Sequence, residues 1–254
     1  MSVLVSQPPP SPDVNGAGLL AEALDPLRYD GQADDPHEVA GLLKALMPER
    51  VRVLDIGCGT GSVTVVANKG KHNNVIAVEP DGRRAAIARE RGLEVVCGHL
   101  TPEFVDERGP FDVVMLSDVL EHVAAPEDFL GLVLTALKPG GQLLISVPNV
   151  AHWSIRLNLL FGRFDYEAHG ICDVTHLRWF TEKSATELIR RMGLDVLAVK
   201  HTAGKTLAVY REGPLHAIPG AILFRAVQRL TKLFPRLFGC QVVIAARKPA
   251  AGSA

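Results

Sequence analysis

"VRVLDIGCGTG", residues 51–61, is the stretch of this sequence that decides the fold. It begins with β-branched and apolar residues, which predict a buried strand over Val51–Ile56. It ends in three glycines, and glycines at a strand end indicate a sharp turn or a close approach by another molecule. A helix is expected over Gly61–Asn68. The stretch therefore predicts the first strand, turn and helix of an α/β unit.

The alternation of strands and helices continues on both sides of this stretch. Further strands are expected at Asn74–Glu79, Leu93–Cys97, Phe111–Ser117, Gln142–Val147, Asp195–Val199 and Cys240–Ala246, the last returning to the sheet edge. Helices are expected at Pro36–Met47 with Asp35 as N-cap, and at Asp81–Arg91, Pro126–Leu137 and Thr181–Met192. Apolar strands alternating with helices predict a doubly wound, mostly parallel α/β sheet. Ligands of such sheets bind at the carboxyl ends of the strands.

The composition limits the class of protein. The chain has 254 residues and a net charge of −1, so bulk electrostatics do not favour a nucleic-acid partner. We expect a leader over residues 1–25 that forms no fixed structure and one domain over residues 26–254. The N-terminus lacks the pattern of a secretory signal, and the four widely spaced cysteines read as reduced thiols, so a cytoplasmic location is expected.

Two acids flank the glycines. The glycines follow a GxGxG pattern rather than the GxGxxG of dinucleotide sites, and Asp55 precedes Gly57 by two residues. A carboxylate there repels a pyrophosphate and suits a cationic amine. Glu79 ends the second strand, where it can accept hydrogen bonds from both hydroxyls of a ribose. An amine and a ribose without phosphate describe S-adenosylmethionine; a ligand-free turn and a nicotinamide-dependent dehydrogenase are the alternatives.

A family resemblance rests on these residues and those that follow. "VLDIGCGTG" with "VIAVEPD" resembles the class I S-adenosylmethionine-dependent methyltransferases over roughly residues 35–200. "FDVVMLSDVLEHVAAPEDFLGLVLTALKPGGQLLISVPN" resembles the branch of the ubiquinone-biosynthesis O-methyltransferases and MetW-like proteins. "VPNVAHW" and "DVTHLRWFT" resemble methyltransferase-like proteins of bacterial surface-glycan and secondary-metabolite gene clusters. The resemblance implies a Rossmann-like, seven-stranded sheet.

The resemblance also implies the residues of the donor site. Glu79 takes the ribose hydroxyls, Tyr29 closes over the cofactor, and His99 stands where an acid commonly contacts the adenine. The full expected set for S-adenosylmethionine is Tyr29, Asp55, Gly57, Cys58, Gly59, Thr60, Gly61, Glu79, Pro80, His99, Leu100, Ser117 and Asp118.

The acceptor side is predicted less sharply. Residues 149–180 break the alternation and are expected to form an acceptor lid. A hydroxyl acceptor needs a base near neutral pH, for which the candidates are His122, His152 and His176. Expected acceptor contacts are Asn149, Trp153, Asp173 and Arg178, and the competing interpretation is that these residues only hold the lid together. No metal is expected, although Asp118, Glu121 and His122 match positions that bind a divalent metal in ubiquinone-type relatives.

A basic amphipathic insertion is expected over residues 214–238. Four cations recur at helical spacing among apolar residues, and no acidic residue follows Glu212; the cations are Arg225, Arg229, Lys232 and Arg236. One interpretation is peripheral contact with the inner membrane face through residues 219–238, which suits an acceptor carried on a lipid. The other is packing on the domain or on a second copy in a homodimer.

These patterns predict an S-adenosylmethionine-dependent methyltransferase. The expected reaction is O-methylation of a sugar, glycolipid or secondary metabolite by in-line displacement, with a histidine as general base. A MetW-like, cofactor-binding partner protein with little or no catalysis is the alternative from another class. An N-methyltransferase is the alternative within the same class.

Overall fold

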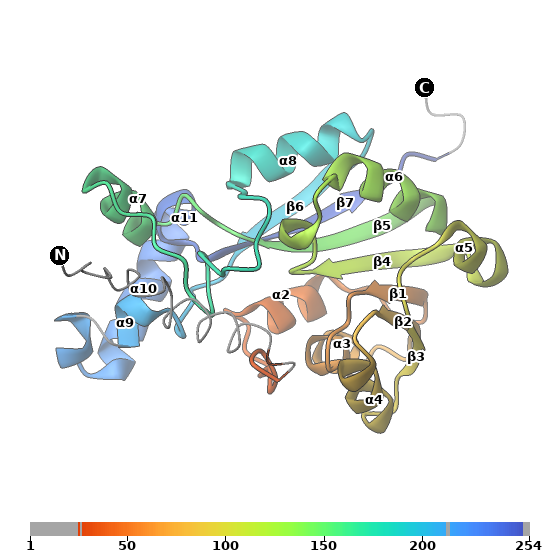
Figure 1. The fold of residues 1–254 in the computed structure, drawn as a ribbon, viewed down its shortest axis with the longest axis horizontal. Helices are drawn as coiled ribbons and strands as arrows, with labels where there is room; N and C mark the ends of the chain where they lie inside the picture. The colour runs from red at the N-terminus through yellow and green to blue at the C-terminus, as the bar shows by residue number, and fades with distance from the viewer. Residues whose placement is uncertain (1–24, 26, 212–213, 251–254) are drawn as a thin grey trace, which may run out of the picture.

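The computed structural model describes residues 25, 27–211 and 214–250, so most of the expected leader lies outside the described residues (Figure 1). The strands form one seven-stranded sheet in the order β3-β2-β1-β4-β5-β7-β6, in which β7 runs antiparallel to both of its neighbours. Their bounds are β1 Arg52–Ile56, β2 Asn74–Glu79, β3 Glu94–Cys97, β4 Phe111–Ser117, β5 Leu137–Pro148, β6 Asp195–His201 and β7 Gln241–Arg247. The expected mostly parallel, doubly wound sheet is confirmed.

Helices cover both faces of the sheet (Figure 1). Their bounds are α2 Val39–Leu46, α3 Ser62–Asn68, α4 Gly82–Glu90, α5 Pro102–Arg108, α6 Pro126–Ala136, α7 Trp153–Leu160, α8 Glu182–Arg191, α9 Ala208–Arg211, α10 Gly220–Leu233 and α11 Pro235–Phe238, with 3₁₀ turns η1 Leu120–His122 and η2 Pro214–Ala217. Consecutive residues of a strand point to opposite faces of the sheet. Met115 packs in the hydrophobic core cluster that includes residues of α2, and Leu116 packs in the cluster that includes residues of α6 and α8. This double burial explains why the central strands are apolar throughout.

Two predicted details of the fold are wrong, and two helices were not predicted. The first helix begins at Val39 rather than Pro36, because the Asp35 carboxylate accepts the His37 N–H in a turn that precedes the helix. The C-terminal strand is not at the edge: β7 lies between β5 and β6, as its continuously buried residues require. Helices α5 and α7 were not expected, although Thr101 followed by Pro102 is an N-cap and N1 signal.

The topology brings four chain segments to one end of the sheet. The ends of β1, β2 and β4 are neighbours, because β1 pairs with both β2 and β4 in parallel. Turn η1 follows β4 directly, and the segment after α7 returns to it, since the Leu177 N–H donates to the Glu121 carbonyl at 2.7 Å. Among the described residues, no helix combines the length and apolarity needed to cross a membrane.

Candidate functional site

The glycine loop between β1 and α3 leaves one open space. Gly57, Gly59 and Gly61 all have positive φ, from 57° to 77°. A Cβ at Gly61 would lie 2.5 Å from Leu93 Cδ1, and one at Gly57 would lie 2.9 Å from Val119 Cγ2. A Cβ at Gly59 would have no neighbour within 4 Å. Two of the glycines are therefore required by packing, while the space over Gly59 admits a ligand.

Asp55, at the end of β1, carries an unsatisfied oxygen. Its side chain is buried, Oδ2 accepts a hydrogen bond from the Thr64 hydroxyl at 2.5 Å, and Oδ1 has no partner. Burial raises the pKa of Asp55 to about 7, against the effect of the Thr64 hydrogen bond. Because an unpaired buried oxygen is costly, a cationic ligand near Oδ1 would be favoured.

Glu79, at the end of β2, is oriented by the backbone on either side. Oε2 accepts the Gly59 N–H at 2.8 Å, and Oε1 accepts the Asp81 N–H at 2.9 Å. Each carboxylate oxygen keeps a lone pair, so Glu79 can accept two hydroxyl hydrogens as well. The end of β3 lies beside it, where Leu100 is buried, whereas His99 and Pro80 are exposed.

A strap, residues 28–30, joins the glycine loop to the segment after α7. The Asp30 carboxylate accepts from the Thr60 hydroxyl at 2.7 Å and from the Arg91 guanidinium at 2.7 and 2.8 Å. The Tyr29 hydroxyl donates to Asp173 Oδ2 at 2.8 Å. Tyr29, expected over the cofactor, thus has its hydroxyl on the segment after α7, where burial raises its pKa.

Asp173 lies in an internal ion pair rather than facing an acceptor. Its side chain is fully buried, with Oδ2 3.1 Å from the Arg28 guanidinium, whose own side chain is 6% exposed. The Thr175 hydroxyl donates to Asp173 Oδ1 at 2.7 Å. Burial alone would raise the pKa of Asp173, but hydrogen bonds from Thr175 and Tyr29 and the charge of Arg28 hold it below its usual range. No sequence signal pointed to Arg28 or Asp30.

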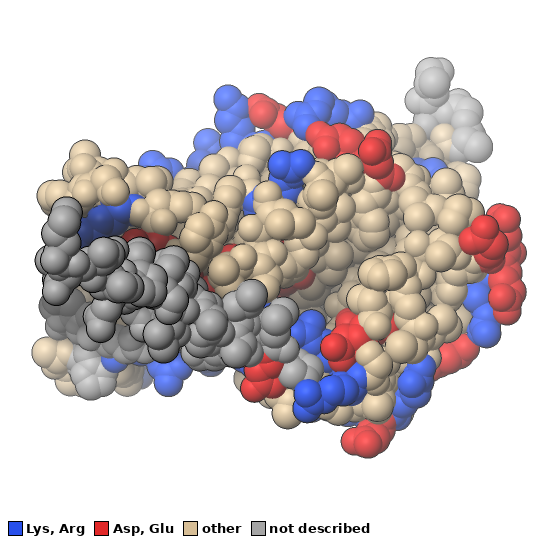
Figure 2. Space-filling view, in the orientation of Figure 1, with Lys and Arg blue, Asp and Glu red and all other residues tan. Residues whose placement is uncertain are grey.

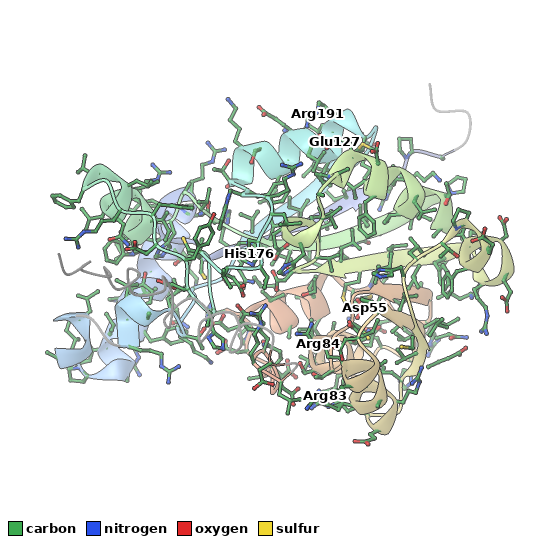
Figure 3. All side chains as sticks on the ribbon, viewed as in Figure 1. Asp55, Arg83, Arg84, Glu127, His176 and Arg191 are labelled. Carbon is green, nitrogen blue, oxygen red and sulfur yellow. The ribbon has the colours of Figure 1, made fainter. Side chains whose placement is uncertain are left out.

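Glu121, His122 and His176 form a compact group, called here the Glu–His–His cluster. One potential ligand atom from each lies within 4.8 Å of the others, and the two imidazole centroids are 4.9 Å apart. Burial lowers the pKa of His176 to about 4 and lowers that of His122, so both rings are neutral near pH 7. Figure 3 shows His176 close to the tip of β4, with Asp55 on the neighbouring β1.

Asp118 and Ser117, which lead from β4 into η1, are tied to other strands. Asp118 has a positive φ of 54°, and its Oδ1 accepts from Gln241 Nε2 at 2.8 Å. Burial raises the pKa of Asp118 to about 6. The Ser117 hydroxyl lies 3.2 Å from that of Ser146 on β5. Asp118 is therefore bonded to β7 and is not one of the three residues of the Glu–His–His cluster.

His152, Trp153 and Asn149, which were expected on the acceptor side, have their polar side-chain groups bonded to other parts of the chain. His152 is fully buried and its two ring nitrogens contact the Ser154 hydroxyl at 2.8 Å and the Tyr210 hydroxyl at 3.2 Å. Trp153 donates to the same Tyr210 hydroxyl at 2.9 Å, and the Asn149 amide donates to the Gly239 carbonyl at 2.8 Å. These side chains attach α7 to the C-terminal helices.

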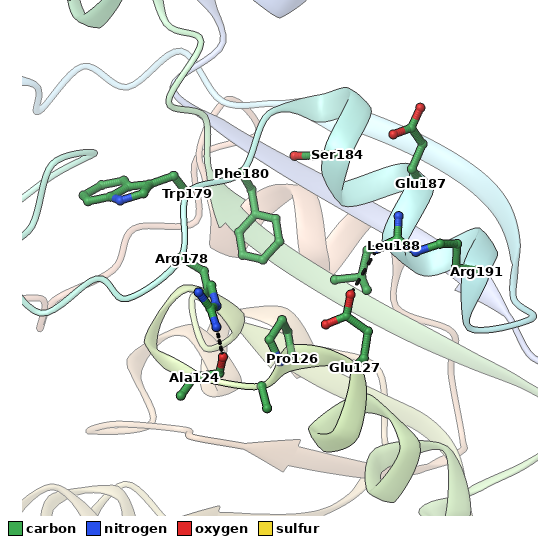
Figure 4. A pocket seen from close by; sticks show the side chains of 11 residues that line it. Ala124, Pro126, Glu127, Arg178, Trp179, Phe180, Ser184, Glu187, Leu188 and Arg191 are labelled. Atoms are coloured by element: carbon green, nitrogen blue, oxygen red, sulfur yellow. Dashed lines mark hydrogen bonds and ion pairs between the residues drawn. The ribbon is translucent and has the colours of Figure 1, made fainter.

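Arg178 lines a separate groove of about 500 Å³ between the starts of α6 and α8 (Figure 4). Its guanidinium donates to the Ala124 carbonyl, and Glu127 pairs with Arg191 at 3.1 Å across the groove. Neither the glycine loop nor the Glu–His–His cluster lines this groove. The candidate site is therefore assigned from the side chains at the ends of β1 and β2, and not from this groove.

Residues 28–199 match the family model described as a methyltransferase domain. The chain belongs to the methyltransferase domain family. A relative of this chain, the ubiquinone biosynthesis O-methyltransferase of Roseobacter denitrificans, is 37% identical over 202 residues, which cover 72% of this chain and 76% of the relative. The protein of the same description from Maricaulis maris is 37% identical over 130 residues, covering 49% of this chain and 51% of the relative. The chain thus spans about half the length of several curated relatives that it matches.

The fold of the chain also matches a solved structure. An S-adenosylmethionine-dependent methyltransferase from Archaeoglobus fulgidus aligns with a TM-score of 0.54 at 21% identity, covering 85% of this chain and 97% of that chain. Family and fold are those of the class I S-adenosylmethionine-dependent methyltransferases. The unpartnered Asp55 oxygen, the space over Gly59 and the doubly anchored Glu79 fit that cofactor.

Proposed function

We propose that this methyltransferase transfers a methyl group from S-adenosylmethionine to a hydroxyl of a small acceptor. The observation that carries the proposal is the unpartnered Asp55 oxygen and the Glu79 carboxylate, which flank the one open glycine. S-adenosylmethionine supplies an activated methyl group bound to a sulfonium. Asp55 binds the ammonium of its methionine part, and Glu79 binds the ribose hydroxyls.

The protein's remaining task is to align the acceptor and remove its proton. Two neutral imidazoles suit this task, and we propose His122 or His176 as the base. Each has one ring nitrogen engaged by a backbone carbonyl, at 3.1 Å for His122 and 3.0 Å for His176, so the other nitrogen is free to accept a proton. The O-methyltransferase names of the relatives support a hydroxyl rather than an amine as acceptor.

The proposed acceptor is a sugar, glycolipid or related metabolite, and a lipid-borne acceptor is supported by the surface of α10. Val227 and Thr231 bury one side of this helix, while Ile222 and Leu233 are 61% and 71% exposed beside exposed arginines. Apolar side chains among cations suit an anionic bilayer surface. On the face seen in Figure 2, by contrast, Lys and Arg mix with Asp and Glu over α6 and α8.

Calorimetric titration with S-adenosylmethionine and S-adenosylhomocysteine tests the donor site. Replacing Glu79 by alanine removes charge-assisted hydrogen bonds worth about 1.5–3 kcal/mol each, so Glu79→Ala should bind at least tenfold more weakly. Glu94→Ala, which removes an exposed acid at the start of β3, is the matched control and should bind normally. Well-folded protein that binds neither ligand would exclude the proposal. Binding without turnover of any hydroxyl acceptor would favour the partner-protein alternative.

Co-sedimentation with vesicles tests the surface of α10. The wild type should bind vesicles that contain anionic lipid and lose about 1 kcal/mol of affinity per cation removed. Arg225→Glu with Arg229→Glu should therefore abolish most of the binding. The control, Lys183→Glu with Arg190→Glu on exposed positions of α8, changes the net charge equally. Equal loss in both double variants would argue against α10 as the contact.

A further inference from the structure

We propose that Arg84 binds an oxyanion, a carboxylate or a phosphate, of the acceptor. The inference rests on the proposed methyl transfer, because it names the chemical class of the molecule that receives the methyl group. Arg84 lies in the first turn of α4, and this helix begins shortly after Glu79 at the end of β2. An acceptor that carries an acidic group beside its hydroxyl is thereby favoured over a neutral one.

The Arg84 guanidinium has no bonded partner among the described residues. Its Nε is buried without a hydrogen bond, although the residue as a whole is partly exposed. Because a buried donor without a partner is costly, a ligand that accepts hydrogen bonds from this group is favoured. A guanidinium presents its donors in a plane, and this arrangement matches two oxygens of a carboxylate or a phosphate.

Two other arginines near the glycine loop are already engaged. The Arg91 guanidinium pairs with Asp30 at 2.7 Å. Arg89 donates to the Val95 carbonyl from Nε at 3.1 Å and from a terminal nitrogen at 2.8 Å. Neither can bind a ligand without giving up these bonds, whereas Arg84 has none to lose.

The start of α4 keeps a net positive charge. Asp81 Oδ1 accepts the backbone N–H groups of Arg83 and Arg84, both at 2.9 Å. These bonds lower the pKa of Asp81, and the charges of the two arginines lower it further, so this carboxyl is ionised near pH 7. One carboxylate beside two guanidiniums leaves one positive charge to attract an anion.

Arg84 also lies near a proposed base. Figure 3 shows Arg83 at the rim of the molecule in this view and Arg84 further in, toward His176. Burial lowers the pKa of His122, and the charge of Arg84 contributes to this effect. An acceptor whose hydroxyl reaches His122 can therefore place an acidic group within reach of Arg84.

The same electrostatics argue against the donor as the source of the anion. The ammonium and the carboxylate of S-adenosylmethionine are attached to one carbon. A cation that bound this carboxylate would therefore lie close to Asp55, which is proposed to bind the ammonium. The neighbouring charge that acts on Asp55 is that of Glu79 and not that of Arg84.

The test titrates inorganic phosphate into full-length protein that is saturated with S-adenosylhomocysteine, and phosphorus NMR measures the binding. The wild type should bind phosphate at one site. Arg84→Gln should bind it at least about tenfold more weakly, because hydrogen bonds to a charged group are lost. Arg83→Gln makes the same change of charge at the exposed neighbouring position and should bind phosphate as the wild type does. Glucuronate should displace the phosphate, and glucose should not.

Donor affinity separates this inference from the proposed function. Arg84→Gln should bind S-adenosylhomocysteine as tightly as the wild type and melt at the same temperature, since its guanidinium has no bonded partner. A wild type that does not bind S-adenosylhomocysteine would overturn the proposed function and this inference with it. Donor binding as weak in Arg84→Gln as in Glu79→Ala would overturn the inference alone. So would a wild type that binds no phosphate, equal losses in Arg83→Gln and Arg84→Gln, or displacement by glucose as effective as by glucuronate.

Discussion

At the scale of a single residue, Asp55 makes donor binding depend on pH. Its pKa is raised to about 7 by burial, so the carboxyl is mostly neutral below that pH and cannot balance an ammonium. The affinity for S-adenosylhomocysteine should therefore rise by up to tenfold per pH unit between about pH 5.5 and 7. Above about pH 8 the ligand's own amine loses its proton and the gain ends. Calorimetric titrations across this range measure the slope.

Two variants separate Asp55 from other titrating groups. Asp55→Asn should bind weakly with little pH dependence, while Glu79→Ala should bind weakly but keep the slope. Because the folded-state pKa of Asp55 lies above its unfolded value near 3.9, ionisation destabilises the ligand-free fold as pH rises from about 4 to 7. Asp55→Asn should therefore be more stable than the wild type at pH 8. A wild-type affinity that is flat across this range would contradict this role for Asp55.

Two glycines of the same loop should respond differently to alanine. Both require positive φ, which costs an alanine roughly 1–2 kcal/mol. Gly61→Ala adds a clash with Leu93 and Ala88, so it should lower the melting temperature further than Gly59→Ala. Gly59→Ala should fold but lose donor affinity, because its methyl enters the open space. Thermal unfolding and calorimetry on both variants distinguish packing from binding; equal donor affinity in Gly59→Ala and the wild type would show that the space is not used.

At the scale of elements, the strap contacts the segment after α7 through the buried ion pair of Arg28 and Asp173. Removing one partner of such a pair typically costs about 3–5 kcal/mol, because the other charge stays buried and unpaired. Arg28→Met should therefore lower the free energy of unfolding by this amount, measured by urea denaturation. Arg28→Met with Asp173→Asn should recover part of the loss. Arg108→Met breaks the exposed pair with Glu94 and should cost less than about 1 kcal/mol; a similar cost for Arg28→Met would mean that the strap is not held by this pair.

The same elements show how far the sequence predicts the structure. The sequence correctly places Asp55 and Glu79 at the ends of two strands and the glycines in the turn after β1. Strand, turn and helix are contiguous there, so their geometry follows from local pattern. The directions of His152 and Asp173 were not found. His152 contacts Tyr210, 58 positions away, and Asp173 pairs with Arg28, 145 positions away. In an irregular segment, the direction of a side chain depends on its hydrogen-bond or ion-pair partner. A local sequence pattern does not identify a partner so far away in the chain.

At the scale of the whole molecule, a path of hydrogen bonds and strap backbone connects the glycine loop to turn η1. It runs from Thr60 to Asp30, through the strap to Asp173, and from Thr175 to His122. Its ends lie in segments that the chain brings together only by folding. The contacts at Thr60 and Asp173 are at least partly buried, and the contact between Thr175 and His122 is exposed. Because the strap joins these contacts through its backbone, ordering the glycine loop should also order the segment after α7.

Hydrogen exchange with bound S-adenosylhomocysteine measures this coupling. At a ligand concentration 100 times the Kd, binding stabilises the fold by about 2.7 kcal/mol in any variant. In the wild type, protection should extend beyond the glycine loop to the amides of residues 168–176. Asp30→Ala breaks the path at Thr60 and Arg91, so at the same multiple of its own Kd it should protect the loop but not those amides. Asp34→Ala removes a nearby acid that pairs with Lys44 and should behave as the wild type. Equal protection of residues 168–176 in Asp30→Ala would mean that the strap is a structural tie only, and that the two halves of the site order independently.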